Sequence, residues 1–174
     1  AWVYDPWLEQ AVAVEGAPAA WLQSSLLCAS ALLTLLLSCV DPPRRVGWRL
    51  LAGVLLCAAL DERFMGHERL QDWLHWQLAD APWLARWAGY VPIAAYALGG
   101  VIAVGWLWRA LGPGLPRRQI VAALAVGCAA IALDLLTTRL DWQIVEEALE
   151  ALAETLWLTA LLQHTVRLFW QRAG

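Results

Sequence analysis

Long apolar stretches alternate with short polar segments along the chain. The stretches lie at about 19–40, 46–65, 88–111, 119–138 and 144–169. A helix that crosses a bilayer needs about 20 residues, each adding about 1.5 Å of rise. The first and third stretches reach this length with apolar residues alone, whereas the other three include carboxylates. The pattern predicts an all-α protein, with five transmembrane helices in one bundle and residues 1–174 forming a single transmembrane domain.

Turn-forming residues separate these stretches. An Asp-Pro-Pro segment at 41–43 closes the first stretch, and a Gly-Pro-Gly segment at 112–114 closes the third. Residues 71–87, between the second and third stretches, mix Trp and Leu with Asp and His. This mixture is typical of a helix that lies in a membrane surface. We expect the second helix to continue beyond the membrane, and an amphipathic helix to lie on the outer surface until Pro82.

The composition agrees with a membrane protein and excludes some other classes. Hydrophobic residues make up 61% of the chain, which is too much for an ordinary soluble domain. The net charge of −3 and the lack of a long basic run argue against binding to nucleic acid. Four cysteines lie in apolar runs without C-x-x-C spacing, so we expect buried packing residues rather than disulfides or metal ligands: Cys28, Cys39, Cys57 and Cys128.

The arginines indicate an orientation, because positively charged loops stay on the cytoplasmic side of a membrane. Eight of the twelve basic residues gather at one side: Arg44, Arg45, Arg49, Arg109, Arg117, Arg118, Arg167 and Arg172. We therefore expect the N-terminus outside and the C-terminus in the cytoplasm, in a multi-pass protein of the bacterial inner membrane. Tryptophans gather near both expected membrane interfaces, as is usual in such proteins.

Carboxylates gather on the opposite, outer side. Asp61, Asp134 and Glu154 belong to three different spans, roughly 24, 24 and 20 Å of helix away from the cytoplasmic arginines. An ionisable group inside a bilayer is costly and usually faces the bundle interior. Asp61 also begins a stripe that reaches His75 if the helix continues unbroken through Gly66. The sequence therefore predicts a cluster of carboxylates and histidine in the outer half of the bundle.

Three explanations of this cluster remain open: ion pairs with arginine, a bound cation, or a proton relay. The first would use Arg63, Arg69, Arg86 and Arg139. The second would favour a divalent cation such as Ca, Mn or Fe, because the ligands are mostly carboxylate oxygens. The candidate metal ligands are Asp61, Glu62, His67, Glu68, Asp134, Glu147, Glu150 and Glu154.

Two acidic elements carry a resemblance. The segment 60–68 reads L-D-E-x4-H-E, and the segment 146–150 reads E-E-x-x-E. The pair resembles a motif of uncharacterised bacterial multi-span membrane proteins, in which both elements stand at span ends. The resemblance covers about fifteen residues and implies that the two acidic elements belong together, but it implies no reaction.

The sequence favours a non-catalytic accessory subunit of a larger membrane complex. Short loops point in this direction, as does a small-residue stripe of Ala95, Gly99 and Ala103, which permits close approach of another helix. We therefore expect the lipid bilayer and other membrane protein subunits as partners. The alternative is a metal-dependent membrane enzyme that uses the acidic cluster. An ion or proton pathway is less favoured, because the cytoplasmic half of the spans offers few polar residues.

Overall fold

The structure is a computed structural model that describes residues 18–81, 83–84, 87, 90–136 and 140–174. Within these ranges all regular structure is helical, which confirms the all-α prediction there. The α-helices are α2 (Pro18–Val40), α3 (Arg45–Phe64), α4 (Gly66–Gln77), α6 (Val91–Ala110), α7 (Leu115–Leu136) and α8 (Leu140–Ala173). A 3₁₀ turn, η1 (Pro42–Arg44), joins α2 to α3. Each of the five expected spans thus contains one long helix.

Two helical segments are long and apolar enough to cross a membrane, judged by length and composition. They are Pro18–Val40 and Leu115–Leu133, while the apolar part of α6, Ala94–Ala110, is shorter. The helices α3 and α8 carry several arginines and carboxylates, which lower their hydropathy. These two segments support association with a membrane. The other three spans of the five-span bundle stay predictions from the sequence.

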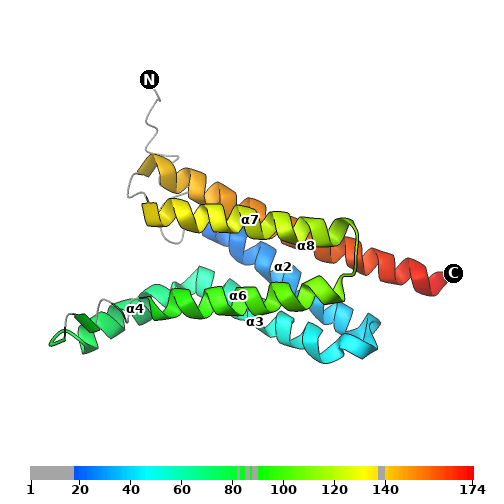
Figure 1. Ribbon diagram of the computed structural model, residues 1–174, viewed down its shortest axis with the longest axis horizontal. Coiled ribbons are helices and arrows are strands. Elements are labelled where there is room, and N and C mark those ends of the chain that lie inside the picture. Colours follow the sequence, from blue (N-terminus) through cyan, green and yellow to red (C-terminus); the bar gives the residue numbers. More distant parts are fainter. Residues whose placement is uncertain (1–17, 82, 85–86, 88–89, 137–139) are drawn as a thin grey trace, which may run out of the picture.

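The helix α2 holds the assembly together, because it packs along both α3 and α8. The helix α7 packs along α8 (Figure 1). In Figure 1, α7 and α8 form one side of the molecule and α3 and α6 form the other. The packed helices therefore follow the order α3, α2, α8, α7, and α6 is attached to them by few contacts.

The apolar core lies at one end of the bundle. We call this the basic end: the end that carries residues 37–55, 103–120 and 157–172, and most of the arginines. Core side chains come from α2, α3, α6, α7 and α8, including Leu37, Trp48, Leu107, Ile120 and Leu161. The opposite end, which carries residues 18–30, 58–77, 91–98 and 140–154, is called the acidic end. Among the described residues, the acidic end adds only the partly buried Leu27 to this core, so the packing of the two ends differs.

Backbone geometry explains the sharp connections. Gly112 and Gly114 have φ values of 63° and 134°, which favour glycine, so the Gly-Pro-Gly segment ends α6 and starts α7. The break between α3 and α4 falls at Met65, a non-glycine residue with a left-handed φ of 52°. The expected amphipathic helix is therefore separate from the second span, and it ends at Gln77 rather than at Pro82. Pro82 itself lies outside the described residues.

The structure extends one further expectation and corrects another. The helix α8 has 34 residues, or about 51 Å, so it is longer than the stretch 144–169 and than a bilayer core of about 30 Å. Three of the four cysteines, Cys39, Cys57 and Cys128, are exposed on the bundle rather than buried between helices. They point outward because the helix contacts fall on other faces, and a small polarisable side chain is tolerated on an apolar surface.

Candidate functional site

The acidic end holds two separate polar groups instead of one. Asp61 and Glu62 are adjacent in sequence, so they point about 100° apart around α3. The interactions of Asp61 are with α4 and α6. Glu62 lies within electrostatic range of Glu150 and Glu154 on α8. The residues expected to form one cluster therefore divide at this point of α3.

The first group, Asp61 with His67 and Tyr96, forms the α3–α4 joint. An oxygen of Asp61, Oδ1, accepts a hydrogen bond from the backbone N–H of His67 at 2.8 Å. Its other oxygen lies 2.7 Å from His67 Nδ1, and the carboxylate also interacts with the side chain of Tyr96. The first N–H groups of a helix lack partners within it, so Asp61 caps the start of α4.

Gly66 is required at this joint. A Cβ atom at this position would lie 2.6 Å from Asp61 Oδ1, which is closer than real contacts allow. The order of the three residues thus has a structural reason. Asp61 caps the helix, Gly66 leaves space for its carboxylate, and His67 donates the N–H that is capped. The continuous stripe from Asp61 to His75 does not form, because the left-handed Met65 interrupts the helix.

The second group lies between α2, α3 and α8, and we call it the glutamate group: Gln23, Glu62, Glu147, Glu150 and Glu154. Gln23 Nε2 donates a hydrogen bond to Glu150 Oε2 at 3.0 Å. Gln23 also interacts with Glu147, and its side chain is only 1% exposed. The group thus joins Glu62 of the L-D-E-x4-H-E element to Glu147 and Glu150 of the E-E-x-x-E element.

Two oxygens in the glutamate group are buried without a hydrogen-bond partner. They are Oε1 of Gln23 and Oε2 of Glu154. A buried polar atom that lacks a partner costs about 1–3 kcal/mol, and a buried charge costs more. Such atoms indicate a place where a donor or a cation is favourable.

Two of the expected arginine partners, Arg63 and Arg69, are described, and neither supplies that charge. The guanidinium of Arg63 lies 4.2 Å from the ring centroid of Trp21. Among the described residues, neither Arg63 nor Arg69 forms an ion pair with a carboxylate, since the ion pairs there are Arg44–Asp41 and His67–Asp61. Arg86 and Arg139 lie outside the described residues.

The geometry of a metal centre is not present among the described side chains. No three His, Cys, Asp or Glu side chains in that part of the chain converge closely enough to hold a metal ion. The side chains of two predicted ligands, Glu68 and Asp134, lie outside it. Asp61 and His67 belong to the joint, and Glu62, Glu147, Glu150 and Glu154 belong to the glutamate group. The cation site therefore stays a prediction.

Gln23 and Tyr96 were missed by the sequence analysis. Gln23 was hidden because it is one polar residue near the start of an apolar run. Its helical phase gives a signal, since Gln23, Ser30, Thr34 and Ser38 follow one face of α2 and all four are buried. Tyr96 has no such signal, because only the path of α6 brings it to Asp61.

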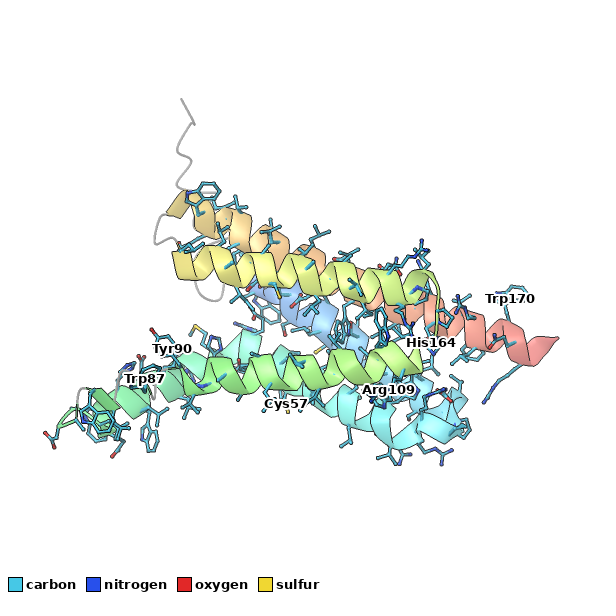
Figure 2. The ribbon with its side chains drawn as sticks, in the orientation of Figure 1. Cys57, Trp87, Tyr90, Arg109, His164 and Trp170 are labelled. Atoms are coloured by element: carbon cyan, nitrogen blue, oxygen red, sulfur yellow. The ribbon has the colours of Figure 1, made fainter. Side chains whose placement is uncertain are left out.

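The basic end has its own buried polar residues. The indole N–H of Trp48 donates a hydrogen bond to Asp41 Oδ2 at 3.0 Å, and Arg44 pairs with the same oxygen at 3.2 Å. The ring of His164 lies 5.7 Å from that of Trp48, and both of its nitrogens are buried without a partner. Figure 2 places His164 and Arg109 at this end, and Trp87 and Tyr90 far from it.

Comparison with known proteins identifies the family. The chain belongs to the family described as Domain of unknown function (DUF8692), whose model matches residues 4–164. The match covers both acidic elements, the glutamate group and His164. No curated protein and no solved structure is significantly similar to the chain.

Proposed function

We propose that the protein is a multi-pass protein of the bacterial inner membrane, with five spans, the N-terminus outside and the C-terminus in the cytoplasm. The support is the agreement between helices and charge: each expected span contains a helix, and the basic end carries most of the arginines. On this arrangement the acidic end faces outward, and α4 lies near the outer surface with exposed Leu70, Trp73 and Trp76.

Labelling of single cysteines in intact cells tests this orientation. In a chain whose four cysteines are replaced by serine or alanine, Gln77→Cys on α4 is expected to react with a membrane-impermeant maleimide. Gln171→Cys near the C-terminus is expected to react only after the cells are permeabilised. Labelling of both positions from outside, or the reverse pattern, would contradict the proposed orientation.

Within the membrane, the protein acts as a non-catalytic accessory subunit of a larger complex. The loose attachment of α6 carries this proposal. Its C-terminal part joins the core through Trp106, Leu107 and Ala110, whereas Leu98, Val101 and Ile102 are exposed. Space is open around Gly99, Gly100 and Gly105, where an added Cβ atom would meet nothing within 4 Å. Small residues with open space permit close approach of a helix from another subunit.

Purification from native membranes in mild detergent tests the accessory role. We expect the wild-type protein to migrate as a complex with another membrane protein at a constant ratio. Gly99→Leu fills the open space and is expected to release that protein, whereas Val54→Leu, on an exposed face of α3, is expected to retain it. A wild-type protein that is monomeric in mild detergent would contradict the proposal.

The glutamate group is proposed to bind a divalent cation that stabilises the subunit, with Ca, Mn and Fe as candidates. The support is the pair of unpartnered oxygens, Gln23 Oε1 and Glu154 Oε2, beside several carboxylates. A cation there would satisfy oxygens that no arginine among the described residues neutralises. Glu62, Glu147, Glu150 and Glu154 are the proposed ligands, while Asp61, His67, Glu68 and Asp134 stay predictions from the sequence.

Metal analysis by mass spectrometry tests this site in protein purified without chelator. We expect one of the three metals at a stoichiometric level in the wild type and its loss in the Glu150→Gln/Glu154→Gln variant. Asp80→Asn, which removes an exposed carboxylate just beyond α4, is the matched control and is expected to keep the metal. Absence of metal from the wild type would overturn the cation site and leave the accessory role to its own test.

A further inference from the structure

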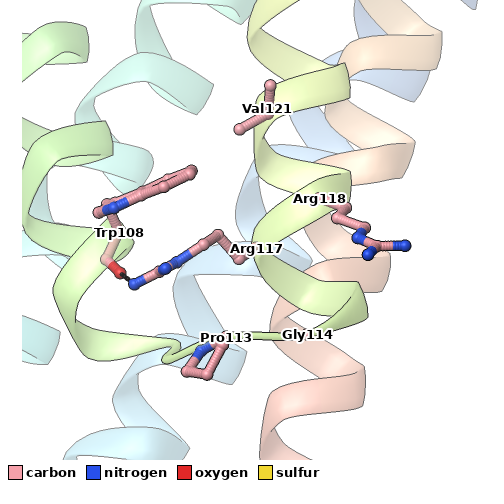
Figure 3. Close-up of a pocket in the computed structure, with 6 residues that line it drawn as sticks. All are labelled: Trp108, Pro113, Gly114, Arg117, Arg118 and Val121. Atoms are coloured by element: carbon pink, nitrogen blue, oxygen red, sulfur yellow. Dashed lines mark hydrogen bonds between the residues drawn. The ribbon is translucent and has the colours of Figure 1, made fainter.

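A pocket of about 440 Å³ lies at the turn between α6 and α7. Trp108 forms one wall, the Pro113–Gly114 backbone forms the floor, and Val121 lies one turn further along α7 (Figure 3). Arg117 and Arg118 also line it, both from the first turn of α7. The pocket is therefore lined by both apolar and cationic side chains.

Arginines from two helices meet at this turn. The guanidinium of Arg117 lies 4.1 Å from the ring centroid of Trp108 and donates a hydrogen bond to the carbonyl of Trp108. Arg167 reaches the turn from α8, where its Nη1 donates to the carbonyl of Pro113 at 3.4 Å. A Cβ atom on Gly114 would lie 2.8 Å from Arg167 Nη2, so glycine makes this approach possible.

No carboxylate balances this charge within the described part of the chain. Arg117, Arg118 and Arg167 form no ion pair there, and the Nε atom of Arg117 is buried without a partner. The first turn of α7 contains no acidic residue. The nearest acid along the basic end, Asp41, is already engaged by Arg44 and Trp48.

The backbone adds to the attraction for an anion. The first N–H groups of a helix have no acceptor within it, and they lie at the positive end of the helix dipole. In α7, Pro116 has no N–H and the N–H of Arg118 donates to the carbonyl of Gly114, so the N–H groups of Leu115 and Arg117 remain at this turn. Phosphate oxygens suit such a combination, because arginine donates several hydrogen bonds in a planar arrangement.

We propose that this pocket binds the phosphate group of an anionic phospholipid. The apolar surroundings favour a lipid over free phosphate as the source. Leu115, Val121 and Leu124 are exposed along α7 beside the pocket, so acyl chains would cover them while the headgroup meets the arginines. Basic pockets between helices on the cytoplasmic side are typical sites for acidic headgroups. This inference rests on the proposed membrane orientation, and it is independent of the glutamate group and of the accessory role.

Titration of the purified protein with defined ligands tests the proposal. Native mass spectrometry in dodecyl maltoside would count bound phosphatidylglycerol, with phosphatidylcholine and inorganic phosphate as comparison ligands. We expect saturable binding of phosphatidylglycerol, weakened about fivefold for each arginine removed in Arg118→Gln and in Arg117→Gln/Arg118→Gln. Arg49→Gln, which removes an exposed positive charge from the same end, is expected to bind like the wild type.

The variants distinguish the possible outcomes. The side chain of Arg118 makes no hydrogen bond or ring contact among the described residues, so Arg118→Gln is expected to fold normally even if loss of Arg117 disturbs Trp108. Equal weakening by Arg49→Gln would overturn the pocket in favour of general surface charge. Binding of phosphatidylcholine as tightly as phosphatidylglycerol would overturn the anionic headgroup. Displacement of the lipid by inorganic phosphate at similar concentration would overturn the lipid as the source.

Discussion

The two ends of the bundle differ in the side chains that fill their buried space. The basic end fills it with large apolar side chains and pairs Asp41 with Trp48, although both ring nitrogens of His164 are buried there without a partner. The acidic end places Gln23, Glu150 and Glu154 between helices and leaves two of their oxygens without partners. The first arrangement stabilises the fold. The second lowers stability unless a ligand or a partner completes it, which is why the proposed function is placed there.

The joint and the glutamate group make a second contrast within the acidic end. Asp61 and His67 satisfy each other and determine the path of the chain into α4. The glutamates do not change the direction of the chain in this way, because α8 continues as one helix through all of them. Acidic residues close in sequence thus have different roles, one structural and one proposed for binding.

The largest effect is expected from removal of the aromatic core at the basic end. Trp48 is 0% exposed and packs edge-to-face on Trp106, with ring centroids 4.7 Å apart. Trp48→Ala should lower the free energy of unfolding by about 3–5 kcal/mol, because it leaves a large cavity. Denaturation in mixed micelles followed by circular dichroism would measure this. Trp170→Ala, at a side chain that is 75% exposed, is the control, and an equal loss there would contradict the distinction between core and surface.

A smaller effect is expected at the α3–α4 joint. Gly66→Ala should destabilise the protein by about 1–3 kcal/mol, because the added methyl group displaces Asp61 from the N–H of His67. Gly53→Ala in α3 meets open space and should be neutral or stabilising by up to about 1 kcal/mol. Hydrogen exchange of the α4 amides would report the loss of the cap. Unchanged exchange in Gly66→Ala would show that the joint does not depend on this contact.

Variants of Gln23 test whether the glutamate group depends on its hydrogen bond and on a cation. Gln23→Leu keeps the approximate volume but removes the hydrogen bond to Glu150, so we expect a loss of about 1–3 kcal/mol in metal-free protein. Gln23→Glu adds a carboxylate, and it should be tolerated better with the cation present than after treatment with chelator. Thermal unfolding with and without chelator would measure both variants. Equal stability of Gln23→Glu in the two conditions would argue against a cation.

The smallest effect is expected for Arg63. Its contact with the ring of Trp21 is partly exposed, so Arg63→Gln should cost about 0.5–1 kcal/mol in thermal unfolding. Arg69→Gln, which removes an exposed charge from α4, should cost less. If Arg63→Gln proved as damaging as Gln23→Leu, Arg63 would be neutralising the glutamates through a rearranged side chain, contrary to the structure.

The helices were predictable because their causes lie in the order of residues. Apolar run length indicates five long helices, and segments such as Asp-Pro-Pro and Gly-Pro-Gly end them whatever surrounds them. The concentration of acidic residues near one end of several helices was also predictable from their positions along the chain. The break at Met65 was not, because a left-handed methionine is unfavourable locally and is held by the contacts of Asp61 with His67.

By itself, the sequence determined which segments are helical and which ends of them are acidic or basic. Those properties follow from local backbone preferences and from one-dimensional spacing. Only the tertiary structure decided that Asp61 turns to His67 and Tyr96 while Glu62 turns to the glutamates of α8, and that Gln23 donates a hydrogen bond to Glu150. These choices depend on which helix lies beside which, and helix neighbours are set by packing across more than a hundred residues of chain, which spacing along one helix does not record.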